Sequence, residues 1–336
     1  MSTRLLPANE KGNLGISHLP RLWSKIKQNL DSKVKEELSE NEWTQDLIVL
    51  DELKLGTLEP LEFICSTNAS LEEFENWILE KNGGSIESSV VDKINRAILQ
   101  NSDEVKDYTP TKTVLSKEDL EFFDTNGYVV VKGAISPEES QKTIDAIGEF
   151  LGLDLSIEEN WYKVDGGFWV KMYHNEMLSK NRNSEKIKIA YQQLLKSNDI
   201  FCSHDRVSIN PPETDSFSFN GPDLHWDVSL NLPMPFGLQG LLYLTDVKEN
   251  GGAFSCVAGF HKKIESWLKE FEDESEAHNF DLHTLGVKQI SANAGDFIIW
   301  DDRLPHGASP NLSNTPRIVQ YINMYTSKKT YNNIWK

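Results

Sequence analysis

Short strand-like segments separated by turn residues fill the second half of the chain, and they constrain its fold most strongly. From residue 201 onward, runs of β-branched and aromatic residues are interrupted by Gly, Pro and Asn. These runs are 206–209, 225–230, 238–247, 253–257, 286–291, 296–300, 305–308 and 317–325. One helix, marked by Ile264, Trp267 and Leu268, interrupts them. About eight short strands with so little helix between them favour a jelly-roll barrel over alternating strand–helix units.

The first part of the chain has a helical pattern instead. Leu22, Ile26 and Leu30 recur at every fourth residue, so this segment has one apolar face. Ser70 and Glu73 have the spacing of a capping box, in which each side chain accepts a hydrogen bond from the other residue's backbone amide. We therefore expect helices here, including one that begins directly after Ser70.

A polar stretch without periodicity, residues 101–115, separates the two patterns and is the expected linker. After it, Ser116 begins a predicted helix, and a β-branched strand follows at 128–131. Ser136, Pro137 and Glu139 then form a second helix start.

The predicted fold class is α+β. A small α-helical accessory domain (1–100) precedes a domain (116–336) that is a double-stranded β-helix, or jelly-roll, with flanking helices.

Charge and composition exclude several classes of partner. Lys and Arg number 34 against 52 Asp and Glu, which gives a formal net charge of −18. Such a chain is a poor ligand for nucleic acid or anionic membranes. No apolar run is long enough for a signal peptide or a membrane span, so we expect a cytoplasmic protein. Its three cysteines, Cys65, Cys202 and Cys256, are scattered, which favours reduced thiols over a disulfide framework.

Two histidines and one aspartate form the most specific candidate site. In an extended segment, alternate side chains point to the same side, so His225 and Asp227 emerge together and Trp226 points away. His306 follows a strand-like run and lies in the turn-rich Pro305-His306-Gly307, which makes it the best candidate for a third ligand. Two imidazoles and one carboxylate on one side of a metal ion form the facial triad of non-haem Fe(II) oxygenases.

An ordered set of motifs resembles the phytanoyl-CoA dioxygenase family of Fe(II)- and 2-oxoglutarate-dependent oxygenases. The motifs are 127–133, 225–227, 241–246, 250–254, 257–262 and 295–301, followed by His306, Gly307, Asn311 and Arg317. The resemblance implies a double-stranded β-helix barrel, with iron held by His225, Asp227 and His306 and with 2-oxoglutarate as co-substrate. The first 100 residues are faintly similar to small bacterial helical proteins, and this likeness implies no activity.

The resemblance also suggests the remaining site residues. Arg317 is expected to hold the distal carboxylate of 2-oxoglutarate, because a guanidinium can bind a carboxylate through two hydrogen bonds. Ser309 or Asn311 would add a hydrogen bond, and Lys171 and Gln239 fall where the family often has co-substrate or substrate contacts. The side chains expected to line a substrate pocket are Trp226, Trp300, Phe219, Asn220 and Met172.

Three functions remain open. The first is a dioxygenase that uses O2 to hydroxylate a small or medium-sized organic metabolite, with succinate and CO2 as co-products; Asp227 stands where halogenating relatives have a small residue. The second is a catalytically inactive binding or scaffold protein. The third is a zinc hydrolase that uses the same three ligands. The helical N-terminal domain is a candidate surface for a protein partner or for self-association. The chain has no strongly basic cluster that would bind the phosphates of coenzyme A.

Overall fold

The structure of the chain is a computed structural model, which describes residues 4–31, 39, 41–99, 108–164, 168–271 and 274–332. The chain divides into two compact units. Unit 1 is Met1–Thr109, Asp199–His204 and Thr326–Asn333; unit 2 is Pro110–Asn198, Asp205–Tyr325 and Ile334–Lys336. Unit 1 therefore includes two segments, 199–204 and 326–333, that the predicted boundaries assign to the barrel domain. Residues 101–107 of the predicted linker lie outside the described residues.

Unit 1 is built from amphipathic helices: α1 (Leu19–Asp31), α2 (Glu42–Glu52), α3 (Glu59–Thr67), α4 (Leu71–Lys81) and α5 (Ser88–Leu99), with the short strand β3 (Phe201–Cys202). The capping box at the start of α4 is confirmed. Ser70 Oγ accepts a hydrogen bond from the Glu73 amide at 3.3 Å, and Glu73 Oε2 accepts one from the Ser70 amide at 2.7 Å. The apolar faces of the helices supply buried residues such as Leu22, Ile48 and Phe74.

The helices of unit 2 also begin and end where local chemistry dictates. They are α6 (Lys117–Asn126), α7 (Pro137–Leu151), α8 (Glu176–Arg182), α9 (Glu185–Leu195), α10 (Ile264–Leu268) and α11 (Glu274–His278), with 3₁₀ turns at Glu158–Lys163, Phe260–Lys262 and Leu282–Leu285. Ser116 and Ser136 each form a capping box, which confirms both predicted starts. Gly127 ends α6 with a φ of +78°, and a Cβ there would lie 2.6 Å from His261 Nδ1. Only glycine meets both conditions at this turn.

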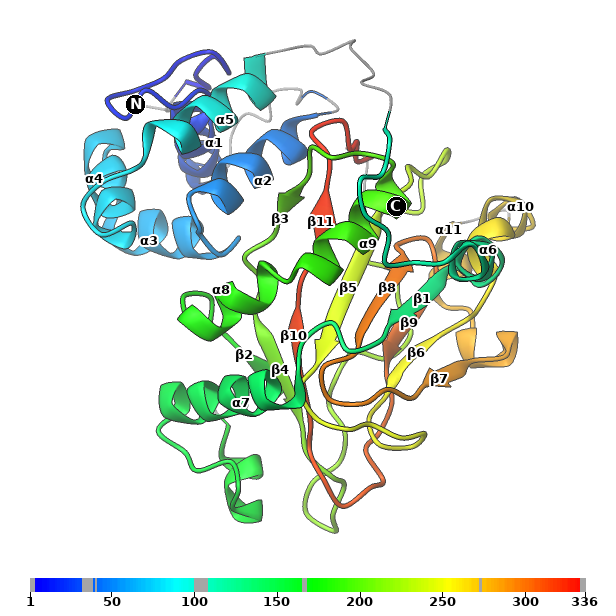
Figure 1. Ribbon diagram of the computed structural model, residues 1–336. Helices are drawn as coiled ribbons and strands as arrows, with labels where there is room; N and C mark the ends of the chain where they lie inside the picture. Colours follow the sequence, from blue (N-terminus) through cyan, green and yellow to red (C-terminus); the bar gives the residue numbers. More distant parts are fainter. Residues whose placement is uncertain are drawn as a thin grey trace. The chain divides into compact units, whose positions relative to one another are not determined.

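Two antiparallel sheets form the centre of unit 2 (Figure 1). The larger sheet has the order β1 (Tyr128–Val131), β8 (Phe297–Asp301), β5 (Leu238–Tyr243), β10 (Arg317–Tyr321), β4 (Val207–Asn210) and β2 (Trp169–Val170). The smaller sheet has the order β7 (Lys288–Ile290), β6 (Phe254–Cys256) and β9 (His306–Ala308). A further short strand, β11 (Met324–Tyr325), follows β10.

The chain crosses repeatedly between these sheets. It leaves the larger sheet after β5 for β6 and β7, returns for β8, crosses to β9 and returns again for β10. Both sheets contribute to one core, in which Tyr243, Ile298 and Val319 of the larger sheet join Phe254 and Ile290 of the smaller one. Two packed sheets connected in this way form a jelly-roll, so the predicted mixture of helices with a jelly-roll is confirmed.

Helices cover the outer face of the larger sheet (Figure 1). Tyr191 of α9 donates a hydrogen bond to the carbonyl of Ile322 at 2.8 Å, and Asn181 of α8 donates one to Gln320 Oε1 at 2.9 Å. The inner face is left for the core and for the site described below. Within the described residues, no helix combines the length and the apolar character needed to cross a membrane.

Three predicted strands differ most from the structure. The predicted strand 238–247 ends at Tyr243, as β5. The segment 225–230 contains no strand: only His225 is paired, through a single bridge to His306. The predicted strand 317–325 is divided into β10 and β11. At the break, Asn323 Oδ1 accepts the hydrogen bond from the Gly240 amide at 2.9 Å, so a side chain replaces a backbone acceptor and interrupts the ladder.

Candidate functional site

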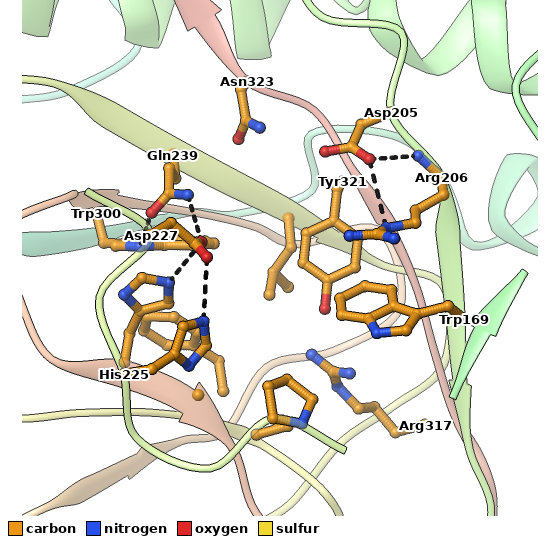
Figure 2. Close-up of a pocket in the computed structure, with 16 residues that line it drawn as sticks. Trp169, Asp205, Arg206, His225, Asp227, Gln239, Trp300, Arg317, Tyr321 and Asn323 are labelled. Atoms are coloured by element: carbon orange, nitrogen blue, oxygen red, sulfur yellow. Dashed lines mark hydrogen bonds and ion pairs between the residues drawn. The ribbon is translucent and has the colours of Figure 1, made fainter. Parts of the chain in front are cut away.

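A cavity in unit 2 opens between the inner faces of the two sheets (Figure 2). Its polar lining residues include Asp205, Arg206, His225, Asp227, Gln239, His306, Arg317 and Asn323. Its apolar and aromatic lining residues include Trp169, Leu241, Phe254, Trp300 and Tyr321. Alternate side chains of a strand point to the same face of the sheet. Arg317 and Tyr321 of β10 therefore lie on the inner face, together with the core residue Val319.

The structure brings His225, Asp227 and His306 together. His225 Nε2 lies 3.2 Å from Asp227 Oδ1, and His306 Nε2 lies 3.3 Å from Asp227 Oδ2. The single bridge between the two histidines fixes their separation, because His225 and His306 exchange backbone hydrogen bonds of 2.9 and 3.0 Å. One atom from each side chain lies within 4.8 Å of the others, which is close enough for all three to bind one metal ion.

Backbone carbonyls determine which imidazole nitrogens face the carboxylate. His225 Nδ1 lies 2.7 Å from the carbonyl oxygen of Asp223, and His306 Nδ1 lies 3.0 Å from that of Leu304. A carbonyl oxygen can only accept, so each Nδ1 carries a proton and each Nε2 of a neutral ring presents a lone pair. Two lone pairs and a carboxylate that face one another require a cation between them. This arrangement fits a divalent metal ion, with the second nitrogen of each ligand held by the backbone.

The pKa values respond to the same contacts. Burial by itself would raise the pKa of Asp227, but hydrogen bonds from His225 and His306 more than offset burial and hold this pKa below its usual range. Burial lowers the pKa of His225, yet the hydrogen bond to Asp227 and its charge outweigh burial, and the pKa lies above its ordinary value. The carboxylate is therefore ionised and attracts positive charge, which either a proton or a metal ion can supply.

Gln239 connects the carboxylate to an aromatic wall. Its Nε2 donates to Asp227 Oδ2 at 2.7 Å, and its Oε1 accepts from Trp300 Nε1 at 3.0 Å (Figure 2). The Trp300 ring lies 5.1 Å from the His306 ring and 4.5 Å from the Phe254 ring, measured between centroids. Gln239 and Trp300, both predicted site residues, thus lie at the cavity, where they orient two of the three candidate ligands.

Arg317 is the deepest charged group in the cavity. Its side chain is 1% exposed, its Nη1 donates to Ser208 Oγ at 3.2 Å, and its guanidinium faces the rings of Phe168 and Tyr243. Its Nε has no hydrogen-bond partner, and among the described residues no carboxylate lies within ion-pair distance of it. A buried guanidinium without a counter-ion is costly, so this position calls for an anion from outside the chain.

Other predicted co-substrate contacts do not line the cavity. Asn311 Nδ2 donates to the carbonyls of Asn210 and Thr315, which commits its amide to the loop that precedes β10. Ser309 Oγ points to the carbonyl of Ala253 at 3.4 Å. Lys171 lies exposed beyond the end of the edge strand β2. None of these three residues is among those that line the cavity.

Most of the predicted substrate-pocket residues lie elsewhere as well. Trp226 donates to the carbonyl of Arg303 at 3.0 Å, and its ring packs beside Phe260 and Trp267, outside the cavity lining. The structure places the remaining three outside the cavity lining: Met172 buried in the core, Phe219 against Phe168, and Asn220 exposed.

Several cavity residues were not predicted as site residues, among them Trp169, Asp205, Arg206 and Tyr321. One signal for Tyr321 was available, because it lies four residues beyond Arg317 in a predicted strand and therefore shares its face. Arg206 begins the predicted strand 206–209, but only the pairing of that strand with β10 brings it to the cavity.

The chain is similar to a known protein family and to several known proteins. The phytanoyl-CoA dioxygenase family model matches residues 123–319, which is more than half of the chain. A Dictyostelium discoideum protein that carries the name of a phytanoyl-CoA dioxygenase is 23% identical over 258 residues, covering 61% of this chain and 74% of that protein. The ectoine dioxygenase of Halomonas elongata is 20% identical over 225 residues, covering 60% of this chain and 68% of its own.

Among solved structures, EvdO2 of Micromonospora carbonacea var. aurantiaca, in complex with 2-oxoglutarate, is similar with a TM-score of 0.49 and 15% identity. The match covers 68% of this chain and 97% of EvdO2. The family match spans His225, Asp227, His306 and Arg317. The chain belongs to the phytanoyl-CoA dioxygenase family.

Proposed function

We propose that this protein is an Fe(II)- and 2-oxoglutarate-dependent dioxygenase that hydroxylates a small or medium-sized organic metabolite, with succinate and CO2 as co-products. One observation carries the proposal. A cavity holds both a triad of His225, Asp227 and His306 with its lone pairs turned inward and a buried Arg317 without a counter-ion. The first feature suits a metal ion, and the second suits the distal carboxylate of 2-oxoglutarate.

Each residue has a defined task in this reaction. His225, Asp227 and His306 would hold iron from one side and leave the opposite positions for co-substrate and O2. Iron with 2-oxoglutarate supplies the activation of O2 needed to oxidise an unreactive C–H bond. Arg317 binds the distal carboxylate of the co-substrate and so fixes its orientation. Leu241, Phe254 and Trp300 exclude water from the reacting groups, and Gln239 holds the Asp227 carboxylate in place.

Hydroxylation is favoured over the alternatives by two residues. Asp227 occupies the position that a halide would need on the metal, so halogenation is disfavoured. A zinc hydrolase with the same triad would need only water as its second reactant, and the buried Arg317 would have no anion to bind. A non-catalytic barrel would need neither the metal triad nor a buried Arg317 without a counter-ion.

Unit 1 is assigned an accessory role, as the surface for a protein partner or for self-association. Its cluster of His18, Glu42 and Asp46 also combines a histidine with carboxylates. Arg21 and Lys25 form ion pairs with those carboxylates, which neutralise the cluster from within the chain. A metal ion would have to displace two cations there, so the chemistry is assigned to unit 2.

The test is an anaerobic titration of the iron-loaded protein with 2-oxoglutarate, followed by the weak visible absorption band of the iron chelate. The wild type is expected to develop the band, and Arg317→Ala to need far more 2-oxoglutarate. Lys142→Met is the control, because it also removes one positive charge but lies exposed on α7. A wild-type protein with bound iron that never develops the band would refute the assignment of 2-oxoglutarate.

A further inference from the structure

We propose that Arg206, held on the indole of Trp169, binds a carboxylate of the substrate, which makes the substrate a small organic acid. The inference rests on the proposed function and specifies its substrate class. It depends on a second guanidinium in the same cavity, one that neither the metal nor the co-substrate requires.

Three neighbouring strands bring the group together. Trp169 lies on β2, Arg206 directly precedes β4, and Tyr321 ends β10. The registers Val170↔Val207 and Gln320↔Val207 place these residues side by side. The Arg206 Cζ lies 4.0 Å from the centroid of the Trp169 ring, and the rings of Trp169 and Tyr321 lie 5.3 Å apart (Figure 2). The result is a cation on an aromatic platform at one wall of the cavity.

The guanidinium of Arg206 is held in one orientation, but its hydrogen-bond donors are not all used. Asp205 Oδ1 accepts a hydrogen bond from the backbone amide of Arg206 at 2.7 Å and lies 3.8 Å from Arg206 Nε. Stacking on Trp169 holds the plane of the guanidinium. Neither Nη atom has a hydrogen-bond partner among the residues that the structure describes, and the side chain is 35% exposed. Two parallel N–H groups are therefore presented to a ligand, which is the geometry that binds a carboxylate through two hydrogen bonds.

Arg317 and Arg206 differ in burial, and this difference suits them to different ligands. Arg317 is 1% exposed, and such a buried cation suits the co-substrate. Arg206 is accessible and suits a substrate that enters later. The formal net charge of −18 repels anions from the protein as a whole, so a local cation is needed to attract an acidic substrate.

A purely structural role explains the geometry less well. The ion pair between the adjacent residues Asp205 and Arg206 is partly exposed and 3.8 Å long, and such pairs contribute little to stability. A structural arginine would be expected to use its Nη atoms within the fold, as Arg303 does in its 2.6 Å contact with Asp301.

The test uses matched pairs of small aliphatic and amino-substituted carboxylic acids and their primary amides, with the corresponding phosphate monoesters as a third arm. Succinate formation from 2-oxoglutarate is measured with each compound. The acids are expected to stimulate it, whereas amides and phosphate monoesters are not. In Arg206→Gln, the KM for a stimulating acid is expected to rise roughly 10- to 100-fold, with a smaller change in kcat.

Three controls keep this proposal separate from the proposed function. The chelate band reports 2-oxoglutarate binding without any substrate, and its titration midpoint is expected to stay near the wild-type value in Arg206→Gln. Lys262→Met removes an exposed cation outside the cavity and is expected to leave the KM for the acid unchanged. Arg206→Lys keeps the charge without the planar fork and is expected to restore only part of the affinity.

Direct binding gives a readout that is independent of turnover. Because Trp169 lies under Arg206, an acid bound there is expected to change tryptophan fluorescence, and Trp169→Phe is expected to lose this signal. The proposal is wrong if amides act as well as acids, if no acid of the panel binds the wild type more tightly than its amide, or if Arg206→Gln shifts the 2-oxoglutarate midpoint instead of the KM for the acid. A preference for phosphate monoesters would also overturn the assignment of a carboxylate.

Discussion

Replacing Arg317 by methionine is expected to stabilise the protein in the absence of 2-oxoglutarate and to abolish the stabilisation that 2-oxoglutarate confers. Arg317 is 1% exposed, and no carboxylate among the described residues pairs with its guanidinium. The folded protein therefore carries the desolvation cost of this cation until an anion binds. Methionine is an unbranched, flexible and uncharged side chain that fills the part of this space nearest to β10.

The magnitude follows from the contacts of the side chain. Burying an unpaired ion costs several kcal/mol even after the protein relaxes. The hydrogen bond to Ser208 returns about 1.5–3 kcal/mol. The ring centroids of Phe168 and Tyr243 lie 5.6 and 6.0 Å from the guanidinium carbon, near the outer limit of a cation–π contact, so each ring returns only about 0.5–1 kcal/mol. The remaining cost is about 1–2 kcal/mol, which corresponds to a rise in Tm of roughly 2–8 °C in the variant.

Thermal unfolding of the Mn(II)-loaded protein, with and without 2-oxoglutarate, is the assay. Mn(II) takes the same imidazole and carboxylate ligands, so binding is measured without turnover. At about 100 times its Kd, the co-substrate is expected to stabilise the wild type by about 2.7 kcal/mol and the methionine variant by close to nothing. Arg317→Lys keeps the buried charge and is the matched control, with no gain in Tm expected.

Two results would refute this reasoning. A clear fall in the Tm of Arg317→Met without co-substrate would mean that the guanidinium is satisfied within the fold. An unchanged increase of Tm on adding 2-oxoglutarate to the variant would mean that another group binds the distal carboxylate.

Three further outcomes are expected. Gln239→Leu removes the amide that holds Asp227 and is expected to weaken metal binding about 10- to 100-fold, measured by Mn(II) titration. The hydrogen bond from the Ser136 backbone amide lowers the pKa of Glu139 from 4.5 to about 2. Glu139 thus stabilises the fold above pH 4.5 and loses this effect as the pH falls toward 2, so Glu139→Gln should lower Tm at neutral pH but not at about pH 2. Burial raises the pKa of Cys256 to about 12, and a thiol reagent is expected to modify it only after unfolding.

Helix starts were the most predictable part of the fold. A capping box is closed by residues three positions apart, so the chain needs no distant partner to form it. Ser70, Ser116 and Ser136 each accept the amide hydrogen bond that such a start requires. The strand at 128–131 was also predicted with its observed bounds, because β-branched residues and the turn at Gly127 mark it locally.

The segment 225–230 was not predictable in the same way. Its composition favours a strand, but a strand exists only where a partner offers a ladder of hydrogen bonds. The neighbouring strand β9 has three residues, and it meets this segment at His225 alone. The two histidines nevertheless meet, since a single bridge is enough to bring both rings to the same carboxylate.

The sequence by itself determined the helix starts, the run of short strands and the residue types of a metal triad, because each of these depends on near neighbours or on side-chain chemistry. Only the tertiary structure decided which side chains meet in the cavity. Trp169, Arg206 and Tyr321 come from segments far apart in the chain, and the register between β2, β4 and β10 sets which face each residue occupies. The burial of Arg317 without a counter-ion is equally non-local. Register and burial depend on contacts between distant segments, and no local pattern encodes them.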